Sequence, residues 1–332
     1  MYPEQKNKEI SWEPTASLPM LKKRADIIDT VRRFFKERHV LEVETPILSH
    51  AAATDPHVLS IEAIFKEHGS ESLQTLYLNT SPEYPMKRLL SKGSGPIYQI
   101  SKVFRQGDLG ALHNPEFTLL EWYRPQFDHH ALMKEVDELL QTVLQTEPSE
   151  YLSYQDAFQK LAGINPHRAC VDELIECAKE HDIDYVSQGD IKNPTIWLHL
   201  LLTHVIEPKI GRIRPVFLYD FPANQAALAK IRYQENPPVA SRFEVYFQGI
   251  ELANGFHELQ DAAEQQKRFL DDLEYRSVHG LPRVPIDQRL LMALQSGLPD
   301  CAGVALGVDR LILLKTKAKS ISEVMSFSFS HA

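Results

Sequence analysis

The stretch from residue 97 to residue 123 restricts the possible folds of this chain more than any other. An apolar run, Ile97–Val103, is typical of a buried strand, and Arg105 follows it closely. A short loop then leads into a second apolar run that ends at Tyr123. The pattern predicts two strands with an arginine at the edge of the loop between them. A guanidinium there can bridge two oxyanions, although a lone arginine is more often a surface salt-bridge partner.

A second arginine, Arg310, ends the segment Gly303–Arg310 near the C-terminus. The glycine-interrupted apolar pattern predicts a strand that runs into a helix over Leu311–Lys315. Gly307 has no β-carbon, so a ligand can approach the backbone closely there. The alternative is that Arg310 and Asp309 form an ordinary charge pair at a helix start. Two arginines on rigid elements are suited to hold a nucleotide triphosphate.

The composition is that of a globular protein with a substantial core. The chain has 332 residues, of which 43% are hydrophobic, and its formal net charge is -9. This charge gives no broad attraction to nucleic acid or to an anionic membrane. The polar N-terminus lacks a signal-peptide core, apolar runs are too short to cross a bilayer, and the cysteines show no CxxC spacing. We therefore expect a cytoplasmic protein with reduced thiols and no membrane partner.

Helix and strand patterns follow one another without a regular β–α–β order. Helical periodicity predicts an amphipathic helix over Ser17–Arg38 with Ser17 as its N-cap, and further helices over Glu83–Leu90 and Ala262–Gly280. Strand patterns occupy Val40–Val43, Val58–Lys66, Thr75–Asn79, Ile97–Phe104, Phe117–Arg124, Val216–Tyr219, Phe243–Gln248 and Gly249–Leu252. This order predicts an α+β fold with an antiparallel sheet. The chain has no GxGxxG and no Walker-type phosphate loop.

The sequence suggests one domain preceded by a short arm. Residues 1–16 are predicted to form a flexible N-terminal arm, and residues 17–332 a single domain. Within that domain, residues 129–206 have a mostly helical pattern, which we interpret as an insertion.

Two carboxylates near the C-terminal third are candidate metal ligands. Glu251 and Glu258 lie on either side of Asn254-Gly255, a dipeptide typical of hairpin turns. On a hairpin the two side chains could face one another and hold Mg²⁺. The alternative is a pair of solvated strand carboxylates.

A second group of polar residues is suited to bind an ammonium group. Glu121 and Tyr123 are two positions apart on a predicted strand, so both point to the same face. A carboxylate and a phenol there can pair with an ammonium by charge and hydrogen bonding. Ser81-Pro82-Glu83 adds another carboxylate at a strand-to-helix turn. Each feature also has an ordinary structural reading, as a sheet-edge pair and as a helix N-terminus.

Taken together, these motifs resemble those of a known enzyme family. The segments concerned are Glu44–Leu48, Ser81–Leu90, Phe104–Tyr123, Gly249–Leu259 and Gly303–Arg310. They resemble the catalytic domain of class II aminoacyl-tRNA synthetases, most closely the lysine-specific branch. Because the first motif helix begins near residue 17, we expect no anticodon-binding domain before it, which resembles the elongation factor P–lysine ligases. The resemblance implies a six-stranded antiparallel sheet and a homodimer.

The resemblance also implies an activity, its cofactors and its partners. Such a ligase uses ATP and Mg²⁺ to activate (R)-β-lysine as an adenylate, and then joins it to a lysine of translation elongation factor P. Charging of tRNA is not expected. The alternatives are a truncated lysyl-tRNA synthetase that acts on tRNA and a non-catalytic regulator that binds an adenylate.

Site residues follow from the matched motifs. Arg105 and Arg310 are implied as catalytic residues, and Glu251 and Glu258 as Mg²⁺ ligands. The implied ATP-binding residues are Arg105, Gln106, Gly107, Asp108, His113, Asn114, Phe117, Glu251, Leu252, Gly307 and Arg310. The implied substrate-binding residues are Ser81, Pro82, Glu83, Glu121, Tyr123, Glu258 and Ala305.

The chain departs from the family pattern at two positions. The pattern after the first arginine is Arg-x-Glu, but here Gly107 occupies the acidic position and Asp108 follows it. Either Asp108 substitutes through a small loop shift, or one nucleotide contact is lost. Ala305 stands where lysyl-tRNA synthetases tend to have glycine, and we expect it to influence the choice between β- and α-lysine.

Overall fold

The computed structural model describes residues 11–183 and 191–332. Its α-helices are α1 (Leu18–Glu37), α2 (Glu83–Ser91), α3 (His129–Leu144), α4 (Tyr154–Leu161), α5 (Val171–Glu180), α6 (Pro194–Leu201), α7 (Ala262–Val278), α8 (Gln288–Gly297) and α9 (Val308–Thr316). Its strands are β1 (Leu41–Glu42), β2 (Leu48–Ser49), β3 (Glu62–Lys66), β4 (Leu73–Leu78), β5 (Ile97–Phe104), β6 (Glu116–Pro125), β7 (Glu150–Ser153), β8 (Val216–Pro222), β9 (Ile231–Arg232), β10 (Val239–Phe247), β11 (Ile250–His257) and β12 (Cys301–Gly307).

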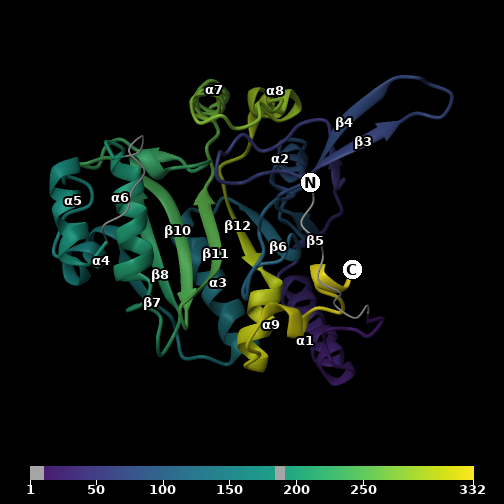
Figure 1. Ribbon diagram of the computed structural model, residues 1–332, viewed down its shortest axis with the longest axis horizontal. Coiled ribbons are helices and arrows are strands. Elements are labelled where there is room, and N and C mark those ends of the chain that lie inside the picture. Colours follow the sequence, from purple (N-terminus) through teal and green to yellow (C-terminus); the bar gives the residue numbers. More distant parts are fainter. Residues whose placement is uncertain (1–10, 184–190) are drawn as a thin grey trace, which may run out of the picture.

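One large sheet forms the centre of the fold (Figure 1). Within the described residues its strand order is β1-β5-β6-β12-β11-β10-β8-β7, and β9 pairs with β10. The six strands from β5 to β8 pair antiparallel, which confirms the predicted α+β fold with its six-stranded antiparallel sheet. Two short strands, β1 and β7, extend the sheet in parallel at its edges.

The main hydrophobic core lies on the sheet face covered by α1, α3 and α9. Phe35 of α1 stacks on Tyr98 of β5 with ring centroids 4.4 Å apart and contacts the edge of Trp122 of β6. All three side chains are buried, so this face of the sheet is closed to solvent. Burial of such aromatic side chains is the largest stabilising contribution to a core of this type.

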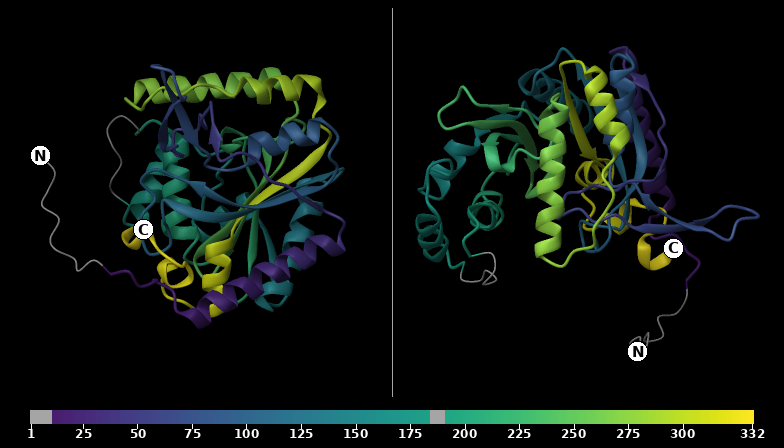
Figure 2. Two further views of the ribbon diagram at one scale, coloured as in Figure 1. Left: turned by 90° about the vertical axis from the view of Figure 1, so that its right-hand side faces the viewer. Right: turned by 90° about the horizontal axis from the view of Figure 1, so that it is seen from above.

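The opposite face of the sheet is covered by α2, α7 and α8 (Figure 2). Met86 of α2, Phe269 of α7 and Leu290 of α8 are buried together against that face. A further core joins α4, α5 and α6 to the outer strands β8 and β10. The β3–β4 hairpin projects away from the rest of the molecule in both figures.

The N-terminal region agrees with its predicted helix start. Ser17 is the N-cap of α1, and its hydroxyl accepts a hydrogen bond from the backbone N–H of Met20 at 3.3 Å. Most of the predicted arm, residues 1–10, lies outside the described residues. Ala16 at its end is buried, and Thr15 bonds to the backbone of Ser326.

Four elements had no clear sequence pattern. The short strand β7 lies within the stretch that is predicted to be mostly helical, and β2, β9 and α8 were not predicted. Each is short or packs on only one side, so its periodicity is weak. In the described ranges, no helix combines the length and the apolar character that crossing a membrane requires.

Candidate active site

A cavity of about 820 Å³ lies between the sheet and the helices α2, α7 and α8. Its lining includes most of the predicted site residues: Ser81, Glu83, Arg105, Asp108, His113, Asn114, Phe117, Glu121, Tyr123, Glu251, Leu252, Glu258, Ala305, Gly307 and Arg310. Pro82, Gln106 and Gly107 do not line it. Residues from both ends of the chain are thus brought into one space.

The two-residue periodicity of β6 separates the cavity from the main core. Leu120 and Trp122 point into the core, whereas Glu121 and Tyr123 point into the cavity. The strand is central in the sheet, so its backbone is held on both sides by β5 and β12. The side chains that face the cavity therefore stand on a rigid support.

One end of the cavity holds three carboxylates around a buried lysine, and we call it the acidic end; its charged residues are Glu83, Lys87, Glu121 and Glu258. The Lys87 ammonium lies 2.6 Å from a Glu83 oxygen and 2.6 Å from a Glu258 oxygen. Glu121 accepts hydrogen bonds from the Ser81 hydroxyl at 2.7 Å and, through its other oxygen, from the Tyr123 hydroxyl at 2.6 Å. Three carboxylates against one ammonium leave two negative charges unmatched when all are ionised.

Burial and mutual repulsion shift the proton affinities of these groups. Burial, with the nearby negative charge of Glu83, raises the pKa of Glu121 to about 7. Burial also raises the pKa of Glu258 to about 8, against the opposing attraction of Lys87. For Lys87, burial alone would lower the pKa, but the attraction of Glu258 and Glu83 outweighs it and raises the pKa. The acidic end thus has less positive charge than its three carboxylates need to stay ionised, and a cation that enters would lower their pKa values.

Gly303 of β12 forms the floor beneath the acidic end. A β-carbon at this position would overlap the ring of Tyr123 and the carboxylate of Glu258. Gly303 is therefore required because Tyr123 and Glu258 pack closely against the backbone at this position.

The other end of the cavity is dominated by arginines. The guanidinium of Arg105 lies 5.1 Å from the centroid of the Phe117 ring, and its buried Nε has no hydrogen-bond partner among the described residues. Burial lowers the pKa of Arg105, although the guanidinium remains a cation. Within the part of the chain that the structure describes, Arg105 forms no ion pair, so an anion that enters the cavity would supply its missing partner.

Arg310 is held in place at the same end by backbone oxygens and by a histidine. Its NH1 donates to the carbonyl of Glu251 at 2.7 Å, and its NH2 lies 2.8 Å from Nε2 of His113. Burial, followed by repulsion from Arg310, lowers the pKa of His113, so the imidazole can stay neutral and accept a hydrogen bond from this arginine. The predicted change from strand to helix is confirmed, but α9 begins at Val308, three residues before the predicted Leu311, so Arg310 lies in its first turn.

The predicted hairpin between Glu251 and Glu258 is wrong. The strand β11 continues from Ile250 through Asn254 and Gly255 to His257. The chain reverses its direction before this strand, at the turn between β10 and β11. Gly255 is needed for packing instead, because a β-carbon there would overlap the Phe243 ring. Seven extended residues span roughly 20 Å at ~3.3 Å each, so the two carboxylates cannot face each other across a turn.

A carboxylate that the sequence did not single out, Glu244, lies closer to Glu251. Both residues line the cavity, and burial together with the negative charge of Glu244 raises the pKa of Glu251 to about 7. Glu244 is itself held by Arg242 and by the Tyr246 hydroxyl. Two cavity carboxylates that repel each other across neighbouring strands are a suitable oxygen donor set for a hard divalent cation such as Mg²⁺.

The loop after Arg105 places its acidic residue in the cavity despite the departure from the family pattern. Gly107 has a φ of +88°, a conformation that favours glycine, and Asp108 lines the cavity while Gln106 is exposed. Asp108 is also the largest source of negative potential at Arg105. This arrangement supports the reading in which Asp108 substitutes for the missing acid.

Asn114 has a structural contact as well as a place in the lining. Its amide donates to the carbonyl of Glu116 at 2.6 Å, and its side-chain oxygen accepts from the backbone N–H of Phe329 at 2.9 Å. The side chain therefore ties the loop to the C-terminal segment.

Sequence reasoning missed Lys87 and Glu244. The spacing of Glu83 and Lys87, four positions apart on one helix, was a usable signal for an ion pair. It could not show that the pair is buried beside Glu258, because that depends on how α2 packs against the end of β11. Glu244 alternates with apolar residues on β10 and carries no motif of its own.

Comparison with known proteins gives a consistent result. The family of class II tRNA synthetases (D, K and N) matches residues 5–331 of the chain. The chain is 52% identical over 322 residues to a curated protein of Salmonella paratyphi A (strain ATCC 9150 / SARB42) named elongation factor P–(R)-β-lysine ligase. A protein of the same name in Salmonella heidelberg (strain SL476) is also 52% identical. Both alignments cover 97% of this chain and 98% of the relative.

Proposed function

Because the chain belongs to the family of class II tRNA synthetases (D, K and N), we propose that it is an ATP-dependent ligase with a protein substrate. It activates (R)-β-lysine as an adenylate and transfers it to the ε-amino group of a lysine on translation elongation factor P. The two Salmonella proteins named elongation factor P–(R)-β-lysine ligase are 52% identical to the chain over almost their whole length. Identity at this level over 97% of the chain supports the same reaction.

The charge distribution in the cavity is the observation that carries this proposal. (R)-β-lysine has two ammonium groups and one carboxylate. At the acidic end three carboxylates face one ammonium, so two of them lack a cation, whereas Arg105 at the other end has no anionic partner among the described residues. A diamino acid with a single carboxylate therefore matches both ends at once. Glu121 and Tyr123 would bind one ammonium, and Ser81 and Glu83 the other.

In the first step the amino-acid carboxylate attacks the α-phosphorus of ATP, and the bond to pyrophosphate breaks. Two anions must approach each other, so positioning and charge neutralisation supply most of the rate. Arg105 would bridge the carboxylate and the α-phosphate, and Arg310 would hold the γ-phosphate. His113, Asp108 and Phe117 would position the nucleotide. Asn114, Leu252 and Gly307 would complete its binding site.

The carboxylates at the arginine end fit a magnesium ion. Glu251 and Glu244 would hold it, in place of the predicted pair of Glu251 and Glu258. When bound, Mg²⁺ supplies positive charge to the phosphates and orients them. Glu258, buried beside Lys87 at the acidic end, would serve the substrate amine instead.

In the second step a deprotonated lysine amine of elongation factor P attacks the carbonyl carbon of the adenylate. An amide forms, the bond to AMP breaks, and the amine gives up a proton. A free lysine ammonium has a pKa of about 10.4, so the acceptor must lose a proton before it attacks. Arg105, beside the single phosphate that remains, would stabilise the negative charge of AMP as it leaves.

Apolar side chains exposed near the N-terminus support a homodimer. Leu41, Leu48, Ile64, Phe65 and Leu73, on the strands β1 to β4, are all exposed. An exposed group of large apolar side chains commonly marks an interface, and a second copy of the chain is the partner that the family resemblance implies. We also propose that the enzyme is cytoplasmic, and that residues 17–332 form one catalytic domain.

Amino-acid-dependent ATP–pyrophosphate exchange tests the proposal. We expect exchange that is stimulated most by (R)-β-lysine, less by α-lysine, and not in the absence of an amino acid. Incubation with elongation factor P should then add one β-lysyl group, detected by intact mass. Exchange without transfer to the factor but with charging of tRNA would favour the truncated synthetase. No exchange despite nucleotide binding would favour the regulator.

A further inference from the structure

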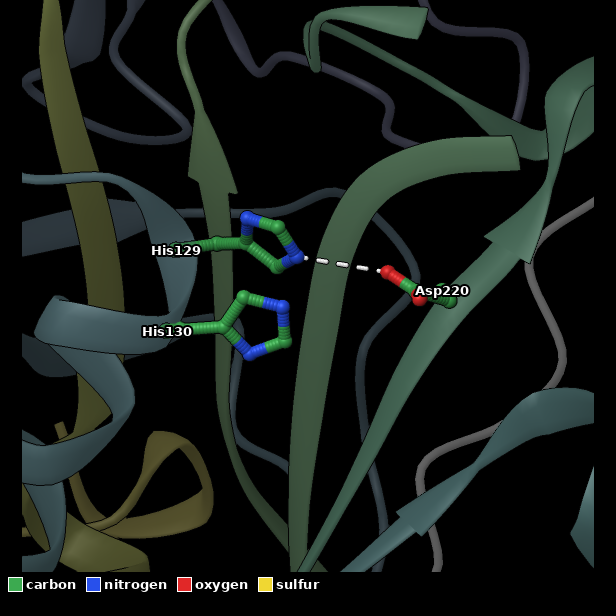
Figure 3. Close-up of side chains that lie close together, drawn as sticks. All are labelled: His129, His130 and Asp220. Atoms are coloured by element: carbon green, nitrogen blue, oxygen red, sulfur yellow. Dashed lines mark hydrogen bonds and ion pairs between the residues drawn. The ribbon is translucent and has the colours of Figure 1, made fainter. Parts of the chain in front are cut away.

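Two histidines and an aspartate converge at the edge of the sheet, away from the cavity. His129 and His130 begin α3, and Asp220 lies near the end of β8 (Figure 3). One ligand atom from each residue lies within 4.8 Å of the other two. Nε2 of His129 is 3.2 Å from Oδ1 of Asp220. None of the three residues lines the cavity described above.

A positive charge already sits beside this cluster. The guanidinium of Arg232 lies 2.7 Å from Oδ2 of Asp220 and 3.0 Å from Nε2 of His129. A neutral imidazole nitrogen is either a donor or an acceptor, but not both. If Nε2 accepts from Arg232, its lone pair faces the Asp220 oxygen; if it donates to Asp220, its hydrogen faces an Arg232 N–H. Each choice leaves one unfavourable close contact.

We propose that His129, His130 and Asp220 form a binding site for a divalent transition-metal ion of the zinc class, which competes with Arg232. Imidazole nitrogen and carboxylate oxygen are ligands that zinc prefers, and a water molecule can complete a tetrahedron. Bonds of about 2.1 Å in that geometry place neighbouring ligand atoms roughly 3.4 Å apart. The separation between His129 and Asp220 already has nearly this value.

The surroundings allow both entry of the ion and removal of the arginine. His130 is exposed and Asp220 is partly exposed, whereas His129 is buried and fixes one ligand. The ligand nitrogen of His130 lies within 4.8 Å of the other two ligand atoms, so this exposed side chain would have to move toward them to complete the site. Glu235, 4.0 Å from Nε of Arg232 and more than half exposed, offers the displaced guanidinium another anionic partner.

Zinc titration of the whole, chelator-treated protein tests this site, with a chromophoric competitor to report free Zn²⁺. We expect one site per chain that His130→Ala weakens by about tenfold or more. The exposed His130 makes few contacts, and thermal unfolding would confirm that the variant folds. His68→Ala, which removes an exposed histidine on the β3–β4 turn, is the matched control and should leave the affinity unchanged.

The variant Arg232→Gln distinguishes between two interpretations of the cluster, a metal site and an ordinary network of ion pairs. If Arg232 competes with the metal, removing its charge should tighten zinc binding, whereas a purely supporting arginine would weaken it. Cobalt(II) should also produce visible absorption bands of a tetrahedral complex in the wild type that are lost in His130→Ala. Equal zinc affinity for the wild type and His130→Ala, or weaker binding by Arg232→Gln, would overturn the proposal.

Discussion

The ammonium of Lys87 lies 2.6 Å from the carboxylate of Glu258, and each side chain is only 1% exposed. The pair joins α2 to the end of β11 at the wall of the cavity. Charges removed from water to this extent depend on each other, because neither can be solvated alone. The ion pair therefore maintains the shape of the acidic end as well as its charge.

Replacing Lys87 by methionine should destabilise the protein strongly. Glu83 and Glu258 would then remain buried without a counter-charge, a change that typically costs about 3–5 kcal/mol. Urea denaturation measures the loss in the free energy of unfolding. Lys22→Met, at an exposed position on α1, is the control and should change little. Adding Glu258→Gln to Lys87→Met should restore part of the loss; full additivity of the two changes would contradict the coupling.

The raised pKa of Glu121 makes stability depend on pH. Its pKa is about 7 in the folded protein but about 4.3 in an unfolded chain, so the folded state keeps a proton that the unfolded state has lost. This contribution is complete below pH 4 and is lost as the pH rises through 7, by up to about 4 kcal/mol. Glu121→Gln removes the titration. Urea denaturation at pH 5 and pH 7.5 should show a smaller decrease for the variant than for the wild type.

Arg105→Lys should impair the chemical step while nucleotide still binds. The lysine keeps the charge but loses the bidentate geometry needed to bridge the carboxylate and the α-phosphate. We expect kcat of the exchange reaction to decrease by about 10²–10³-fold. Arg33→Lys, on the exposed side of α1, is the matched control. An unchanged kcat would remove Arg105 from the proposed mechanism.

Gly303→Ala should damage amino-acid binding more than ATP binding. The added methyl group overlaps Tyr123 and Glu258, so one of these two side chains must move out of the acidic end. We expect KM for (R)-β-lysine to rise tenfold or more, since hydrogen bonds to a charged group contribute about 1.5–3 kcal/mol. The affinity for ATP, measured by calorimetry, should be retained. Equal losses for both substrates would indicate general misfolding.

Ala305→Gly should change the choice between lysine isomers. Ala305 lines the cavity and lies opposite Glu121 in the register of β12 and β6, so its methyl group borders the acidic end. Removing it enlarges the space where the two isomers differ. The ratio of exchange rates with α-lysine and (R)-β-lysine should increase. The same ratio in both proteins would dismiss a role for this position.

The sequence predicted the central strands well because their signals are local. The range Ile97–Phe104 agrees with β5 at both ends, and the Ser17 cap is confirmed. Strong apolar runs and a capping hydroxyl depend little on the rest of the fold. Gly255 was interpreted as a turn residue because Asn-Gly is a common hairpin signal, but a ring from the neighbouring strand requires it. That contact is tertiary and leaves no local pattern.

The sequence motifs predicted which residues line the cavity, but they did not predict which charged side chains are buried together. The order of motifs identified Arg105, Glu121 and Arg310, which all line the cavity. The burial of Lys87 between two carboxylates depends on two segments that are distant in sequence, the helix α2 and the end of β11. A lysine in an amphipathic helix is normally solvated, so only the folded structure distinguishes it.

The strand β11 carries Glu251 toward the arginine end and Glu258 toward the acidic end. The separation of these two residues is set by the backbone repeat of an extended chain and not by loops. The strand thus fixes the distance between the reacting phosphate and the carboxylates that would bind the amine, and the substrate has to span that distance. We therefore expect a diamino acid that is one methylene shorter to leave one end unmatched, so that adenylate formation depends on the length of the substrate as well as on its charge.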